Sequence, residues 1–302
     1  MKRRNFVKKI GVGFTASSLF TNSGISKSFS ENTFKLNYAP HLGMFKNTVG
    51  EDPIDQINFM ADVGFRAFED NNMKQRSVSI QEKISSTLTN RDMRMGVFVA
   101  HKIYWNEPNL TSGDENYRDE FLNQIKESVE VAKRINAKWM TVVPGYLDLR
   151  KNMSYQTSNV IDTLKRASDI LEPHDLVMVL EPLNFRDHPG LFLTKSPQAY
   201  QICKSVNSSS CKILFDIYHQ QIQEGNIIPN IRDTWDEIGY FQIGDNPGRK
   251  EPTTGELNYK NIFQYISSKE FDGILGMEHG NSISGIEGER ALLEAYKQVD
   301  SF

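Results

Sequence analysis

The chain has 302 residues, of which 38% are apolar and 24% are charged, and its formal net charge is −3 at pH 7. This length provides one large domain or two modest ones, with ample material for a buried core. The composition is that of an ordinary globular protein, not of a disordered or membrane protein. No stretch of 18 apolar residues occurs, so the sequence predicts no membrane-spanning helix.

The first residues have the form of an export signal. Basic residues precede a modestly apolar run over residues 10–20. The paired Arg3 and Arg4, followed by Asn-Phe-Val-Lys, resemble a twin-arginine signal, which sends folded proteins across a membrane. We therefore expect residues 1–30 to be a signal segment bound by the twin-arginine export machinery, and the protein to be periplasmic or otherwise exported. A solvated basic tail is the alternative.

Charge and cysteine content exclude two further kinds of protein. Residues 1–30 hold six basic residues and no acidic ones, so their removal takes the net charge from −3 to about −9. Nucleic-acid binding needs a basic surface, which such an acidic body lacks. Cys203 and Cys211 are too few for a disulfide framework, and two buried free thiols are favoured over a single bridge.

From residue 35 onwards, short apolar runs alternate with amphipathic stretches. The runs are mostly rich in Val, Ile, Met and Phe, as is typical of strands buried on both faces. They predict strands at residues 35–42, 65–69, 93–101, 139–143, 176–181, 212–216, 240–244 and 273–278. Between them, apolar residues at helical spacing predict a helix that begins near Pro53, helices over residues 121–135 and 154–171, and a last helix that includes Leu292 and Leu293.

Eight strand–helix alternations in roughly 270 residues match the size and order of a (β/α)8 TIM barrel. We therefore expect residues 31–302 to form a single α/β barrel domain. A doubly wound open sheet is the alternative, but it usually has fewer strands. In addition, residues 40–44 (PHLGM), which follow the first strand, are not a glycine-rich phosphate loop.

Oxygen-bearing side chains end four adjacent strands of this predicted barrel, at the end where the strand–helix loops carry function. They are Glu181, Asp216, Gln242 and Glu278. Buried carboxylates that lie close together need a counter-charge, and a divalent cation supplies it. Oxygen ligands favour Mg²⁺ or Mn²⁺ over zinc. The alternative is that each acid caps a helix or belongs to an isolated ion pair.

Glu181 and Glu278 are also suited to proton transfer. Moving a hydrogen next to a carbonyl requires a base on one face of the substrate and an acid, or a second base, on the other. A metal stabilises the oxygens of the enediolate that forms between the two steps. Because their strands are separated around the barrel, these two glutamates are positioned to flank a bound substrate.

Three segments resemble a known family: residues 180–187 (LEPLNFRD), 215–221 (FDIYHQQ) and, most specifically, 238–259 (IGYFQIGDNPGRKEPTTGELNY). They are similar to the hydroxypyruvate isomerase family, in the xylose-isomerase-like barrel superfamily of sugar isomerases and epimerases. The resemblance extends from about residue 35 to the C-terminus. It implies a metal-dependent isomerase or epimerase that acts on a small sugar or hydroxy-keto acid.

The resemblance also assigns roles to residues. It implies Glu181 and Glu278 as the catalytic pair, and both of them with Asp216 and Gln242 as metal ligands. Relatives often have histidine at the position of Gln242. His219 matches a contact to a substrate hydroxyl. The remaining match is Arg249, which corresponds to an arginine near the oxygen-rich end of the substrate, where its planar fork suits a carboxylate or a group of hydroxyls.

Position alone adds weaker candidates. Glu69 and His101 end the second and third predicted strands and are candidates for substrate binding. Trp105 and Phe45 are candidates for an apolar wall against the face of a sugar. For each of these residues, packing is the competing interpretation.

Two other functions remain open on the same barrel. One is a non-catalytic, exported sugar-binding protein. The other is a metal-dependent phosphodiesterase of the same superfamily, which would need several metals and a histidine-rich rim; the sequence offers His41, His101, His219 and His279 for it. The sequence also leaves the oligomeric state open, and a homo-oligomer is one of the alternatives.

Overall fold

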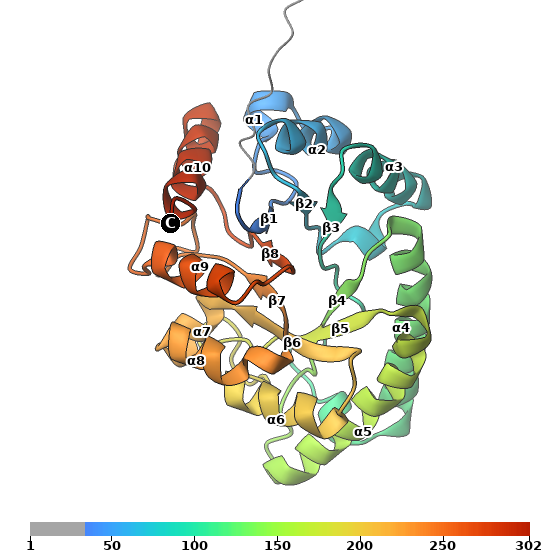
Figure 1. Cartoon of the computed structure of the whole chain (residues 1–302). Coiled ribbons are helices and arrows are strands. Elements are labelled where there is room, and N and C mark those ends of the chain that lie inside the picture. The colour runs from blue at the N-terminus through green and yellow to red at the C-terminus, as the bar shows by residue number, and fades with distance from the viewer. Residues whose placement is uncertain (1–33) are drawn as a thin grey trace, which may run out of the picture. The chain divides into compact units, whose positions relative to one another are not determined.

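Eight parallel strands form the centre of the structure, a computed structural model that describes residues 34–302 (Figure 1). The predicted export signal over residues 1–30 lies outside the described residues. The strands are β1 (Asn37–Ala39), β2 (Ala67–Phe68), β3 (Arg94–Met95), β4 (Trp139–Val142), β5 (Val177–Leu180), β6 (Cys211–Asp216), β7 (Ile238–Gln242) and β8 (Ile274–Gly276).

These strands close into a ring. Six of them pair in the order β1-β8-β7-β6-β5-β4, and β2 pairs with β3. Single backbone contacts join the two sheets: the Glu69 N–H donates to Pro40 O (3.1 Å), and the Thr141 N–H donates to Phe98 O (2.8 Å). A closed parallel ring is the predicted TIM barrel and rules out the doubly wound open sheet.

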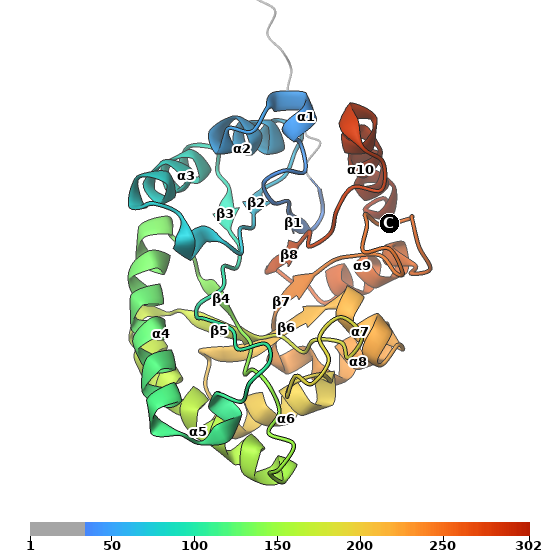
Figure 2. The same cartoon turned by 180° about the vertical axis from the view of Figure 1, so that it is seen from behind.

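Helices surround the ring on its outside, as both views along the barrel show (Figures 1 and 2). The α-helices are α1 (Lys46–Val49), α2 (Pro53–Asp62), α3 (Val78–Asn90), α4 (Glu115–Ile135), α5 (Met153–Leu171), α6 (Ser196–Val206), α7 (Ile217–Gln223), α8 (Ile227–Thr234), α9 (Tyr259–Ser268) and α10 (Gly285–Val299). Short 3-10 helices lie at Met73–Gln75, Leu110–Ser112, Glu172–His174 and Trp235–Glu237. The four helices predicted from apolar spacing are α2, α4, α5 and α10.

The helix starts follow from local chemistry. At the start of α2, the Asp52 side chain accepts a hydrogen bond from the Ile54 N–H (2.7 Å), and Pro53 occupies the first turn, where its missing N–H costs nothing. At the start of α7, Asp216 itself is the cap: its Oδ1 accepts from the Tyr218 N–H (2.8 Å). This capping bond leaves Oδ2 of Asp216 for other partners.

The barrel interior explains why distant acids meet. One layer of it contains a residue from each strand or its continuation: Ala39, Ala67, Val97, Trp139, Val179, Leu214, Tyr240 and Ile274. Side chains alternate between the two faces of a strand, so residues two positions further along face the same interior one level higher. Two positions beyond Val179, Leu214 and Tyr240 these residues are Glu181, Asp216 and Gln242, and Glu278 lies four positions beyond Ile274. The predicted acids therefore share one face of the ring.

The predicted strand ends differ from the structure mainly at β1, β3 and β7. β1 begins two residues after the predicted start at 35 and ends three before the predicted end at 42. Regular pairing in β3 stops at Met95, and only an isolated bridge between Val99 and Thr141 continues it. At Gly96 the backbone passes close to β7, since an added Cβ would come within 2.4 Å of the Tyr240 hydroxyl. β7 begins two residues earlier than predicted, at Ile238, and ends at Gln242.

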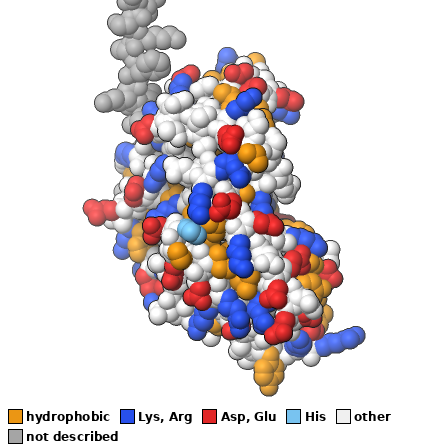
Figure 3. Space-filling view, turned by 90° about the vertical axis from the view of Figure 1, so that its right-hand side faces the viewer, with side chains coloured by type: hydrophobic (Ala, Val, Ile, Leu, Met, Phe, Trp, Pro, Cys, Tyr) orange, Lys and Arg blue, Asp and Glu red, His pale blue; other side chains and the backbone are white. Residues whose placement is uncertain are grey.

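The surface on one side carries charges of both signs, and the two cysteines are free. On the side of α3 and α4, Lys and Arg side chains are interspersed with Asp and Glu (Figure 3). Cys203 and Cys211 are buried free thiols, as predicted. Among the helices of residues 34–302, none has the length and apolar character needed to cross a membrane.

Candidate active site

Three carboxylates converge at the C-terminal end of the barrel. Glu181 follows β5, Asp216 ends β6 and Glu278 follows β8. Together with His219 they offer ligand atoms that all lie within 4.8 Å of one another. Asp216 is fully buried, whereas the Glu278 side chain is 26% exposed, so solvent reaches the cluster beside Glu278.

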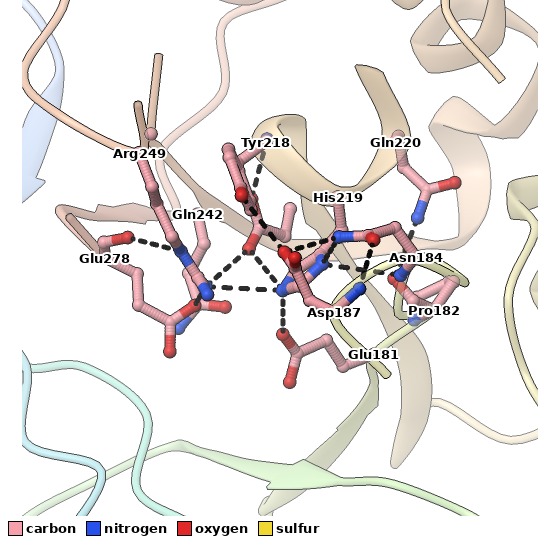
Figure 4. Close-up of polar contacts among 12 residues, drawn as sticks. Glu181, Pro182, Asn184, Asp187, Tyr218, His219, Gln220, Gln242, Arg249 and Glu278 are labelled. Atoms are coloured by element: carbon pink, nitrogen blue, oxygen red, sulfur yellow. Dashed lines mark hydrogen bonds and ion pairs between the residues drawn. The ribbon is translucent and has the colours of Figure 1, made fainter. Parts of the chain in front are cut away.

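Within residues 34–302, the three carboxylates of this cluster are accompanied by a single cationic side chain, that of Arg249. Burial raises the pKa of Glu181 well above its ordinary value, and the charges of Glu278 and Asp216 raise it further. Burial also raises the pKa values of Asp216 and Glu278. One cation, Arg249, lies between them, with Nη2 2.7 Å from Glu278 Oε2 and 3.4 Å from Asp216 Oδ2 (Figure 4). One guanidinium balances only one of three carboxylates.

Gln242 supplies a fourth oxygen beside this cluster. Its Nε2 donates to Glu69 Oε1 (2.9 Å), which assigns the other amide atom as oxygen. The Oε1 of Gln242 is buried and has no hydrogen-bond partner in residues 34–302. A buried acceptor without a partner costs about 1–3 kcal/mol, which coordination to a cation would remove. Three carboxylates and an amide oxygen fit Mg²⁺ or Mn²⁺.

Glu69 lies beside Gln242 and lines a small cavity together with Glu278. It is 2% exposed, and its carboxyl accepts hydrogen bonds from Gln242 and from the Tyr240 hydroxyl (2.7 Å). Burial, assisted by the charge of Glu278, raises the pKa of Glu69 to about 8. Gly276 makes room for it, because an added Cβ there would come within 1.9 Å of Glu69 Oε2.

His219 is held in one tautomer by Asn184. The Asn184 Oδ1 accepts from the Arg186 and Asp187 N–H groups (2.9 and 3.0 Å), so its Nδ2 is the donor. This Nδ2 lies 2.6 Å from Nδ1 of His219, which therefore accepts. Burial lowers the pKa of His219 to about 3, so the ring is neutral. Its proton is then on Nε2, which lies 3.5 Å from Asp216 Oδ2.

This tautomer makes His219 a hydrogen-bond donor to the site. A nitrogen that carries a proton does not ligate a metal. Figure 4 shows the His219 ring between Arg249 and Glu181, with Asn184 on its other side. The geometry therefore fits a hydrogen bond from His219 to a substrate hydroxyl better than coordination of a metal by His219.

His101 and Phe45 are committed to packing. The His101 ring is 6% exposed, its Nδ1 lies 2.8 Å from Lys102 O, and its Nε2 accepts from the Val143 N–H (3.2 Å). Both nitrogens thus have backbone partners, which leaves none for a substrate, and the Nε2 bond ties the segment after β3 to the residue after β4. Phe45 is fully buried and packs against the rings of Phe59 and Phe65.

Asn71 contributes to the site, although the sequence analysis did not single it out. Its Nδ2 donates to Glu278 Oε1 (2.9 Å), which orients that carboxylate together with Arg249. Asn71 stands two residues after Glu69, and Glu69 two after the interior residue Ala67. The same alternation that identified the strand-end acids would have found it.

The other rim histidines do not form a second metal site. His41 Nδ1 lies 2.8 Å from Leu42 O, and His279 Nε2 lies 2.8 Å from the Tyr296 hydroxyl. Within residues 34–302, the cluster around Asp216 is the one group of three or more acidic, His or Cys side chains with metal-binding spacing. This arrangement disfavours the several metals that a phosphodiesterase of this fold would need.

Curated relatives include hydroxypyruvate isomerase from Escherichia coli, 31% identical over 161 residues, and 2-oxo-tetronate isomerase from Cupriavidus necator, 31% identical over 160 residues. Each match covers 53% of this chain and 62% of the relative. The chain thus spans about three fifths of the length of these relatives.

Solved structures with the same fold include an AP endonuclease of family 2 from Brucella melitensis (TM-score 0.74, 22% identity, 86% of this chain and 99% of that one). A 3-keto-D-glucoside 4-epimerase from E. coli is similar as well (TM-score 0.72, 18% identity, 88% and 100%). At these identities the likeness shows the fold alone. The xylose isomerase-like TIM barrel model matches residues 57–298, which is most of the chain. The chain therefore belongs to the xylose isomerase-like TIM barrel family.

Proposed function

We propose that the protein is a metal-dependent isomerase or epimerase of a small sugar or hydroxy-keto acid, with Glu181 and Glu278 as its proton-transfer pair. The observation that carries this proposal is the convergence of three carboxylates, two of them buried, with the unpartnered amide oxygen of Gln242. The names of the relatives, which are isomerases and epimerases of such compounds, support the same class of reaction.

Glu181, Asp216, Gln242 and Glu278 would hold Mg²⁺ or Mn²⁺. The ion, when bound, would stabilise the negative charge that develops on two neighbouring substrate oxygens. This donor set leaves His219 and Arg249 for the substrate. The Nε2–H of His219 donates to a substrate hydroxyl, and the guanidinium of Arg249 contacts the oxygen-rich end of the substrate.

The two glutamates carry the proton itself. One carboxylate removes the proton from the carbon next to the carbonyl; the C–H electron pair becomes the C=C bond, and the carbonyl π pair moves to oxygen to give an enediolate. The other glutamate, which is protonated at the start, returns its proton to carbon as the carbonyl re-forms. Return on the opposite face gives the epimer, and return to the neighbouring carbon, with the hydroxyl proton passing to the other oxygen, gives the isomer. Burial raises the pKa of both groups, which makes each a stronger base once it is ionised.

Hydrogen exchange tests this proposal. With Mn²⁺ present, the full-length protein in deuterated water should replace a C–H proton of hydroxypyruvate or of a ketose such as D-fructose, followed by loss of its proton NMR signal. EDTA and the Glu278→Gln substitution should each stop the exchange. Glu256→Gln, an exposed glutamate, is the matched control and should retain it.

Two outcomes would contradict the proposal. Exchange that persists in Glu278→Gln would remove that residue from the reaction. Calorimetric binding of sugars without any exchange in the unaltered protein would identify a sugar-binding barrel instead.

We also propose that the protein acts outside the inner membrane. The paired arginines and the apolar run of residues 1–30 support twin-arginine export. This route would let a metal enzyme fold and take up its ion before export. Cell fractionation tests the proposal: a shortened protein in the periplasm supports it, and the uncleaved chain in the cytoplasm contradicts it.

A further inference from the structure

A second cavity of about 690 Å³ lies beside the acidic cluster, between the segments that follow β2 and β3 and the helix α4. The side chains that define it include Asn71, Asn72, Lys102, Trp105 and Gln124. Cavities of roughly 300–1,000 Å³ typically hold drug-sized ligands. This cavity therefore offers more room than a three- or four-carbon acid at the cluster would use.

Two sets of contacts connect this cavity with the catalytic residues. Asn71 lines it and donates a hydrogen bond to Glu278. The ring of Trp105 stacks on that of His188, with centroids 5.1 Å apart and planes inclined by 24°. The centroid of His188 in turn lies 5.4 Å from that of His219. A ligand that bridges both regions would thus meet continuous walls.

The cationic side chains of the cavity already have partners. Lys74 Nζ donates to Ala100 O and Gln124 O (2.9 Å each) and lies 3.3 Å from a Glu127 carboxylate oxygen. Lys102 Nζ lies 4.1 Å from the centroid of the Tyr104 ring. The Lys74 ammonium group is thus not left as a free counter-charge for an anionic ligand, and that of Lys102 is exposed to solvent over the Tyr104 ring.

An uncharged polyhydroxyl ring suits the groups that remain. The Trp105 side chain offers a flat apolar face and is 42% exposed although it is stacked. The exposed side chains of Asn72 and Gln75 line the cavity with amide donors and acceptors. A flat aromatic surface beside a few amides matches a sugar ring, which has an apolar face and a rim of hydroxyl groups.

We propose that this cavity is a subsite for a second, uncharged sugar ring, so that the substrate is a disaccharide or glycoside whose reacting sugar lies at Glu181 and Glu278. This inference rests on the proposed isomerase or epimerase function and names its substrate class. Trp105 is the residue on which the second ring stacks.

Calorimetric titration of the full-length protein with Mn²⁺ tests the subsite. D-Fructose and lactulose are the probes, because lactulose is D-fructose that carries one additional galactose ring. The unaltered protein should bind lactulose about tenfold more tightly than D-fructose. Trp105→Ala should weaken lactulose binding about tenfold and change D-fructose binding less than twofold, whereas Trp105→Phe should retain most of the preference.

Tyr155→Ala is the matched control, because Tyr155 is an exposed aromatic residue of α5 that does not line the cavity. It should change neither affinity. Equal binding of the two sugars, binding of neither, or an equal loss of both in Trp105→Ala would overturn the subsite. Hydrogen exchange on D-fructose is measured separately, so exchange without a preference for lactulose would reject the subsite and leave the proposed function standing.

Discussion

The Gln242 amide donates a hydrogen bond to Glu69 Oε1 over 2.9 Å, and this contact determines that the Gln242 oxygen is the atom left without a partner. Gln242→Met keeps the length of the side chain and removes the oxygen. We expect Mn²⁺ affinity, measured by calorimetry, to fall at least tenfold. Gln242→His should retain the affinity, because Glu69 would then orient the imidazole through its second nitrogen. Unchanged affinity in Gln242→Met would show that this oxygen is not a ligand.

Glu69 should make the metal-free protein less stable as the pH rises. Its pKa of about 8 in the folded protein lies above the ordinary 4.5, so its stabilisation is complete below pH 4.5 and is lost as the pH rises through 8. The free energy of unfolding of the unaltered protein, minus that of Glu69→Gln, should fall by up to about 1.4 kcal/mol per pH unit between pH 5 and 8. Urea titrations in EDTA measure this difference, and a difference independent of pH would contradict it.

Gly276 should be intolerant of a side chain because of Glu69. An added Cβ would meet the Glu69 carboxyl at 1.9 Å, so Gly276→Ala should lower the free energy of unfolding by about 1–3 kcal/mol. The same substitution should cost less in a Glu69→Ala background, since the obstructing group is gone. A double-mutant cycle measures this coupling, and strictly additive effects would show that the two residues do not interact.

Asn184 should control the tautomer of His219. Asn184→Asp replaces the donor that faces Nδ1 with an acceptor, so the ring proton should move from Nε2 to Nδ1. Nitrogen NMR of the histidine ring reports this change directly, and turnover should fall about tenfold to a hundredfold. The variant should also lose stability, because Asn184 Nδ2 donates to Asp187 Oδ2 (3.0 Å) and a carboxylate there would face that of Asp187. Retention of the Nε2 proton in the variant would contradict this account of the site.

The sequence predicted the barrel and its acids because both follow from short-range pattern. Strands buried on both faces are visible as apolar runs, and alternation brings Glu181, Asp216 and Gln242 to one face. The role of Glu69 was not predictable in this way, since it depends on Gly276 and Tyr240, which are distant in sequence. His101 likewise looked like a substrate contact until its two backbone partners were known.

The contacts between loop residues were not predictable from the sequence. Trp105 and His188 come from segments about 80 positions apart, and only the folded chain shows that their rings stack. The tautomer of His219 depends on how Asn184 is oriented by its own backbone neighbours. Neither relation leaves a periodic signal in the sequence.

The most direct test of the central claim is the rate of carbon–hydrogen exchange in Glu181→Gln and Glu278→Gln, each measured at a Mn²⁺ concentration that saturates the variant, with metal content determined in the same samples. A proton-transfer pair predicts that both metal-loaded variants lose at least a thousandfold in turnover, while Glu256→Gln retains it. Turnover within tenfold of the unaltered protein in either metal-loaded variant would contradict the assignment of that glutamate.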